Sequence, residues 1–154
     1  MAQIQKITPF LWFDDRIEEA VTLYTSVFKD AKILSTVPGP NGTVMAMTFE
    51  LEGLEFMALN GGPQFTFTEA VSFFVKCETQ AEVDYFWTRL TENGGQESQC
   101  GWLKDRFGLS WQIIPNALMT YLGNPDAARA QRVMQAMLQM HKIDIAALDA
   151  AYAG

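Results

Sequence analysis

The chain has 154 residues, of which 49% are hydrophobic and 12% aromatic, enough for one compact domain or two half-domains sharing a core. Eighteen acidic against eleven basic residues give a net charge of −7, and no local cluster of Lys or Arg offsets it, which argues against nucleic acid as a partner. No stretch approaches the roughly 20 apolar residues of a membrane helix, and the start lacks a signal-peptide pattern. Cys77 and Cys100 lack metal-ligand spacing, so we expect free thiols in a cytoplasmic protein without membrane contact.

Residues 3–13 predict the first strand, because side chains of different character alternate along them. Leu11 and Phe13 fall on one face. The opposite face carries Thr8, Phe10 and Trp12. Pro9 lacks an N–H donor, which indicates an edge strand or a bulge.

A helix is predicted after this strand, with Asp15 as its N-cap and Glu18 completing a capping box. Apolar residues at helical spacing form its buried face: Ile17, Ala20, Val21, Tyr24, Val27 and Phe28. Strands are expected at 31–37 and 43–52 around a turn that ends in Asn41-Gly42, a pair suited to positive φ angles, and at 54–59. Residues 60–63, Asn-Gly-Gly-Pro, then break the pattern and predict a linker between two halves.

The second half repeats the same order of elements. Alternation over 71–77 predicts a strand, Thr79 and Glu82 form a capping box, and the following helix stops at Asn93-Gly94-Gly95. Strands at 96–104 and 109–114 complete this half. Gly53-Leu54-Glu55-Phe56-Met57 is echoed by Gly108-Leu109-Ser110-Trp111-Gln112, which supports an internal repeat.

The segment 101–115, GWLKDRFGLSWQIIP, predicts a hairpin with its turn at 104–108. Its second arm places one set of residues toward the core: Leu109, Trp111 and Ile113. The other set is Ser110, Gln112 and Ile114. We interpret Lys104, Asp105 and Arg106 as a charged turn, although they are also the best candidates for an acid, a base or an anion clamp.

The tail differs in kind from the two halves. Residues 116–122 predict a short helix that stops at Gly123, and Asn124-Pro125 is expected to start another as N-cap and first residue. A stripe of apolar residues follows: Ala130, Val133, Met134, Met137 and Met140. Such a stripe is typical of core or of a subunit contact. His141, the single histidine, is expected to be a surface residue.

The run DRFGLSWQIIP closely resembles the closing hairpin of PhnB-like proteins in the vicinal oxygen chelate (glyoxalase/bleomycin-resistance/dihydroxybiphenyl dioxygenase) superfamily. Similar runs are PFLWFDDRIEEAVTLYTSVF, LNGGPQFTFTEAVSFFVKC and the tail ending KIDIAALDAAYAG. The resemblance implies an α+β fold of two βαβββ modules whose curled sheets surround a cup, with helices at the C-terminus. We expect one domain over 1–154, with module one at about 1–60, module two at about 68–115 and the tail at about 116–154.

Enzymes of this superfamily hold a divalent metal in the cup through His, Glu or Gln. The resemblance places the corresponding positions at Thr8, Met57, Ser72 and Gln112. Hydroxyls, a thioether and an amide are poor ligands for zinc, nickel or manganese, so we predict no metal and no cofactor. Relatives carry a 3-demethylubiquinone-9 3-methyltransferase label, but this sequence has no glycine-rich nucleotide loop to support methyl transfer.

Our leading functional hypothesis is metal-independent binding of a small apolar or aromatic molecule in a cup completed by a second chain. The expected ligand-binding residues are Thr8, Phe10, Trp12, Met57, Ser72, Phe74 and Gln112. The first alternative is a lyase, isomerase or transferase of the superfamily with an unknown substrate, whose catalytic residues stay unassigned. The second is a structural homodimer whose cup is filled by side chains.

Overall fold

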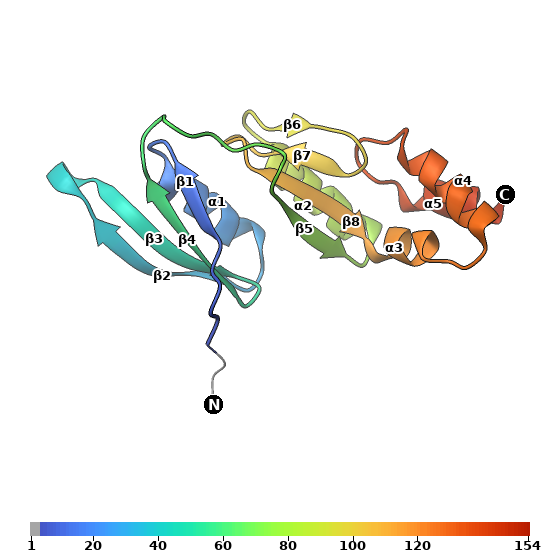
Figure 1. Cartoon of the computed structure of the whole chain (residues 1–154), viewed down its shortest axis with the longest axis horizontal. Helices are drawn as coiled ribbons and strands as arrows, with labels where there is room; N and C mark the ends of the chain where they lie inside the picture. Colours follow the sequence, from blue (N-terminus) through green and yellow to red (C-terminus); the bar gives the residue numbers. More distant parts are fainter. Residues whose placement is uncertain (1–3) are drawn as a thin grey trace. The chain divides into compact units, whose positions relative to one another are not determined.

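The computed structural model describes residues 4–154, which divide into two compact units, one ending at Phe67 and one running from Thr68 to Gly154 (Figure 1). The first unit contains β1 (Phe10–Phe13), α1 (Ile17–Val27), β2 (Ala31–Pro38), the 3-10 turn η1 (Pro40–Gly42), β3 (Val44–Leu51) and β4 (Leu54–Asn60). The second contains β5 (Ser72–Cys77), α2 (Gln80–Thr91), β6 (Gln96–Glu97), β7 (Trp102–Lys104), β8 (Ser110–Pro115), α3 (Asn116–Leu122), α4 (Ala127–Met137) and α5 (Ile145–Ala153). The α+β class and the two βαβββ modules are confirmed.

The first sheet has the order β1-β4-β3-β2, with β1 parallel to β4 and the other pairs antiparallel. The helix α1 covers one face, where Phe49 stacks between Tyr24 and Phe56 at ring-centroid distances of 6.2 and 5.3 Å. Leu11 and Phe13 are buried on this face, as the alternation predicts. The edge position of β1 agrees with Pro9, which has no N–H for a further strand.

The second sheet has the equivalent order β5-β8-β7-β6 and is covered by α2. Its buried face carries Leu103, Trp111 and Ile113. The turns before β4 and β8 each contain a glycine with positive φ, +83° at Gly53 and +87° at Gly108. The repeat seen in the sequence is therefore a repeat of structure.

Two predicted boundaries at the start of the chain are wrong. The first strand begins at Phe10, and the described residues before it are irregular; residue 3 lies outside the described part. Here the side chain of Gln5 replaces strand pairing, because its Nε2 donates to the Glu55 carbonyl at 2.9 Å and its Oε1 accepts from the Glu55 N–H at 3.0 Å.

The predicted Asp15 cap of α1 is also wrong. The N-cap position is Arg16, whose side chain forms no capping bond. Instead, Asn60 Oδ1 at the end of β4 accepts a hydrogen bond from the Ile17 N–H at 3.0 Å, and Asn60 Nδ2 donates to the Val44 carbonyl at 2.9 Å. A residue predicted to lie in a linker therefore ties the helix to the sheet.

In the second unit, Thr79 caps α2 as predicted, since its Oγ1 accepts from the Glu82 N–H at 3.2 Å. The predicted strand 96–104 is instead two strands. They are separated by a turn in which Cys100 and Gly101 have φ of +59° and +84°. The N-cap of α4 is Asp126 and not Asn124, because the Asp126 carboxylate accepts from two N–H groups of the first turn.

The tail packs on its own unit. Its buried cluster comprises Ile114, Leu118, Val133, Ile143 and Leu148, with Met137 and Met140 packed against it. The tail helices therefore cover the end of β8, and of the two interpretations of the apolar stripe, core packing within the chain agrees with this arrangement.

The β7–β8 hairpin is organised by a buried carboxylate. Asp105 is 2% exposed, and its Oδ1 accepts from the N–H groups of Phe107 at 2.9 Å and Leu109 at 3.1 Å. Its Oδ2 accepts from Trp111 Nε1 at 3.0 Å. These bonds support the interpretation of this segment as a turn, and they leave Asp105 unsuited to act as an acid or base at the surface.

Replacing Asp105 with Asn should lower the free energy of unfolding by about 2–3 kcal/mol, because an amide N–H then faces the indole N–H and a charged acceptor is lost. Guanidinium chloride unfolding curves measure this loss. Asp14→Asn, at an exposed carboxylate, is the control and should change stability by less than about 0.5 kcal/mol. Equal stability of the two variants would contradict the structural role of Asp105.

Burial also sets the reactivity of the two free thiols. Cys77 is fully buried, and this burial, followed by the charge of Glu82, raises its pKa from 9.0 to about 12. Stability gained by burying the neutral thiol is complete below pH 9 and declines as the pH rises from 9 through 12.

At pH 8 we expect an aromatic disulfide reagent to label only half-buried Cys100 in the folded protein, and both thiols in guanidinium chloride. Rapid labelling of Cys77 in the folded Cys100→Ser variant, or of both thiols in the folded wild type, would contradict this.

Candidate functional site

The face of the first sheet opposite α1 is apolar and accessible. The register pairs Phe10 with Met57 and Trp12 with Leu59 across β1 and β4. Cross-strand partners share a face, so these side chains form one surface, in which Phe10 is 51% exposed. The structure brings together the predicted residues Phe10, Trp12 and Met57; Thr8, half-buried, precedes the strand.

The Trp12 indole is held in a fixed position by the loop that follows β4. Its Nε1 donates to the Gly62 carbonyl at 2.9 Å, and its ring packs edge-on against Phe65 at 5.0 Å. A Cβ on Gly61 would lie 2.4 Å from the indole, so only glycine allows this approach. The segment predicted as a linker therefore builds part of the surface.

The face of the second sheet opposite α2 combines an exposed aromatic ring with polar groups. The register pairs Ser72 with Ser110 and Phe74 with Gln112 across β5 and β8. Gln112 Nε2 donates to Ser72 Oγ at 2.9 Å, and Phe74 is 43% exposed. The structure thus brings together the three site residues predicted for this half, and it orients the amide of Gln112.

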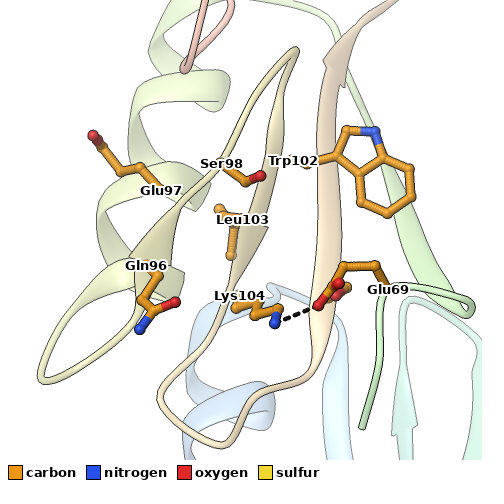
Figure 2. A pocket seen from close by; sticks show the side chains of 8 residues that line it. Glu69, Gln96, Glu97, Ser98, Trp102, Leu103 and Lys104 are labelled. Atoms are coloured by element: carbon orange, nitrogen blue, oxygen red, sulfur yellow. Dashed lines mark ion pairs between the residues drawn. The ribbon is translucent and has the colours of Figure 1, made fainter.

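A pocket of about 230 Å³ adjoins this face within the second unit (Figure 2). Its lining residues are Glu69, Gln96, Glu97, Ser98, Trp102, Leu103, Lys104 and Ser110. Sequence reasoning singled out Lys104 and Ser110 but missed the others. The alternation that places Ser110 and Gln112 on one face also predicts Trp102 and Lys104 there, because they are paired across β7 and β8. No comparable signal points to Glu69.

The pocket contains one ion pair and one hydroxyl without a partner. Lys104 Nζ pairs with the Glu69 carboxylate, as Figure 2 shows. Ser110 is fully buried, and its Oγ has no hydrogen-bond partner within residues 4–154. Glu97 belongs to a different contact, since its Oε1 accepts from Trp87 Nε1 on α2 at 2.6 Å.

The remaining candidates for chemistry lie elsewhere. Arg106 lies over the ring of Phe107 at 5.3 Å. His141 is exposed in the tail, with Nδ1 2.8 Å from the Ser98 carbonyl, in agreement with its interpretation as a surface residue. Cys77 is buried beside α2, with its thiol pKa raised by burial.

The residues at the four positions where the resemblance implies metal ligands do not fit a divalent metal. Thr8 and Met57 belong to the first unit, and Ser72 and Gln112, already bonded to each other, belong to the second. Hydroxyl, thioether and amide groups are weak ligands for such ions. Among the described residues, His, Cys, Asp and Glu form no group of three or more that could hold a metal ion.

In the same part of the chain, no helix has the length and apolar character to cross a bilayer.

Comparison with known proteins places this fold in a family. Residues 5–114 match the family described as 3-demethylubiquinone-9 3-methyltransferase. A putative 3-demethylubiquinone-9 3-methyltransferase, PhnB protein, from Bacillus cereus is 37% identical, with a TM-score of 0.68 over 72% of this chain and 99% of that one. Curated proteins give no match.

Two more distant structures share the fold. A protein from Pseudomonas aeruginosa is 20% identical, with a TM-score of 0.62 over 73% of this chain and 98% of its own. A glyoxylase/bleomycin resistance protein/dioxygenase domain from Frankia is 15% identical, with a TM-score of 0.50 over 75% and 92%. On the family match and the Bacillus cereus relative together, this chain belongs to the PhnB-like family described as 3-demethylubiquinone-9 3-methyltransferase.

Proposed function

We propose that this protein binds a small apolar or aromatic molecule, without a metal ion, on the open faces of its two sheets. The observation that carries the proposal is the combination of exposed aromatic rings with an oriented amide. Phe10 and Phe74 are 51% and 43% exposed on faces that no helix of their own unit covers. Small-molecule sites typically combine apolar walls with a few fixed polar groups, here Gln112 and Ser72.

The alternative of a structural protein, in which side chains fill the cup, has less support. A filled face would bury its aromatic rings, as the opposite face of the first sheet buries Phe49 and Phe56. An enzyme would need a nucleophile beside a base or a pair of acid and base groups. Within residues 4–154, Asp105 is used by the hairpin and His141 stands apart in the tail, so binding is the better supported activity.

A test begins with thermal-shift measurements using phenol and indole as probes, with zinc, nickel and manganese as separate additions. We expect the aromatic probes to raise the melting temperature and the metals to leave it unchanged. Gln112→Ala should weaken binding of phenol by about 1 kcal/mol, the contribution of one neutral hydrogen bond. Calorimetry compares this variant with Gln135→Ala, at an exposed glutamine of α4.

Unchanged affinity in Gln112→Ala would remove Gln112 from the site. Specific stabilisation by a metal would contradict the metal-independent proposal, and chemical conversion of a probe would favour the enzyme alternative.

We further propose that the protein forms a homodimer. The tail apolar residues pack on their own chain, so the support comes from β2, an edge strand with unpaired backbone groups. Three of its apolar side chains, Ile33, Leu34 and Val37, are 42–46% exposed.

The two free thiols suit the cytoplasm, where we place the protein.

Light scattering after gel filtration should give about twice the 17.3 kDa chain mass. Val37→Lys should shift the protein to the monomer, because an edge lysine blocks strand pairing between chains. Thr22→Lys, on the exposed side of α1, is the control and should leave the mass unchanged. A folded monomer of the wild type at micromolar concentration would overturn the homodimer.

A further inference from the structure

Two hydrogen-bond donors lie side by side in the pocket of the second unit. Lys104 on β7 and Ser110 on β8 are cross-strand partners, so both side chains leave the sheet on the same face. Side chains of such partners start about 5 Å apart. The lysine side chain is long and flexible, so its ammonium can reach one oxygen of a carboxylate whose other oxygen accepts from the Ser110 hydroxyl.

The Ser110 hydroxyl lacks a partner that its surroundings would normally supply. Ser110 is fully buried, and within the described chain nothing hydrogen-bonds to its Oγ. Buried hydroxyls are nearly always paired, because an unpaired one costs free energy. The Ser110 hydroxyl therefore has a free donor for a group that takes the place of Glu69 in the pocket.

Lys104 already binds a carboxylate, that of Glu69. Glu69 lies in the irregular segment between β4 and β5, and its side chain is 59% exposed. Ion pairs between exposed side chains contribute little to stability, so a ligand can exchange for Glu69 at small cost. The Glu69 carboxylate therefore marks a position at which an external carboxylate could pair with Lys104.

We propose that this pocket binds the carboxylate of a small aromatic acid. One carboxylate oxygen accepts from Lys104 Nζ and the other from Ser110 Oγ, while Glu69 turns into solvent. This inference rests on the proposed function and gives the ligand its polar group. Trp102 supports the aromatic part, because it lines the pocket (Figure 2). It is also the cross-strand partner of Gln112, which connects the pocket to the open face.

Size and charge agree with a compact acid. The volume of about 230 Å³ lies just below the usual range of small-molecule sites. Two acids, Glu69 and Glu97, and one base, Lys104, line the pocket. An anion can therefore bind only after Lys104 has left its ion pair with Glu69. Glu97 does not compete for Lys104, since its carboxylate accepts from Trp87. The pocket thus selects against anions that bind Lys104 less well than Glu69 does.

Calorimetry at pH 7 with benzoate, benzamide and acetate tests the proposal on the full chain. Benzoate should bind at least about tenfold more tightly than benzamide, its neutral counterpart, and Lys104→Met should remove this difference. Ser110→Ala should weaken benzoate about fivefold to tenfold without lowering stability, because the hydroxyl is unpaired in the free protein. Glu69→Gln should tighten benzoate about threefold or more, since the competing carboxylate is gone.

The control is Lys142→Met, which removes the same charge and an ion pair of 2.8 Å to Asp84 on α2, on the other side of the sheet. It should leave benzoate affinity within about twofold of wild type. Equal binding of benzoate and benzamide, or a Glu69→Gln variant that binds benzoate more weakly, would overturn the carboxylate site while the proposed function stands. Acetate binding that depends on Lys104, with no binding of either aromatic probe, would overturn the aromatic acid as ligand together with the proposed function, and would leave only a general carboxylate site.

Discussion

The buried carboxylate of Asp105 fixes the part of the molecule on which the second open face depends. By accepting from the backbone at Phe107 and Leu109 and from the Trp111 indole, it sets both the turn and the direction in which β8 leaves it. A strand that slips by one residue turns every side chain to the opposite face. With Trp111 held in the core, Ser110 and Gln112 must lie on the open face, and the pairing of β7 with β8 brings Lys104 and Trp102 beside them.

The tail determines how much of that face remains open. Ile114 continues the alternation of Ser110 and Gln112, yet it is buried in the cluster formed with the tail helices. The family match ends at residue 114, just where this covering begins. The tail helices are themselves anchored by Asp126 and Asp144, which cap α4 and α5. The open face is thereby confined to the part of β8 that carries hydroxyl and amide groups.

Local patterns predicted most of the fold, and long-range contacts account for the errors. Alternation of period two predicted the buried and open faces of β1 and β8, and the Thr79 cap needed only a partner three residues away. The cap of α1 was mispredicted because Asn60, which supplies it, lies 43 residues from Ile17. Glu69 escaped notice for the same reason: its contact with Lys104 depends on the path of an irregular segment, for which no periodicity exists. Except for Thr8, the residues predicted for each half share a face, whereas the pocket beside them could be found only from the structure.

Comparison of equivalent positions in the two repeats shows which side chains make the two open faces differ in chemistry. Parallel pairing makes Phe10 beside Met57 equivalent to Phe74 beside Gln112, so an aromatic ring is kept at one position while a thioether replaces an amide at the other. The amide of Gln112 has Ser72 as its partner, and the first sheet has no corresponding bond among its described residues, since Met57 carries no donor. The backbone of the module is thus shared, and the polar character of a face follows from a few side chains on its last strand. The neutral amide on one face and the thioether on the other are in keeping with the metal-independent binding proposed above.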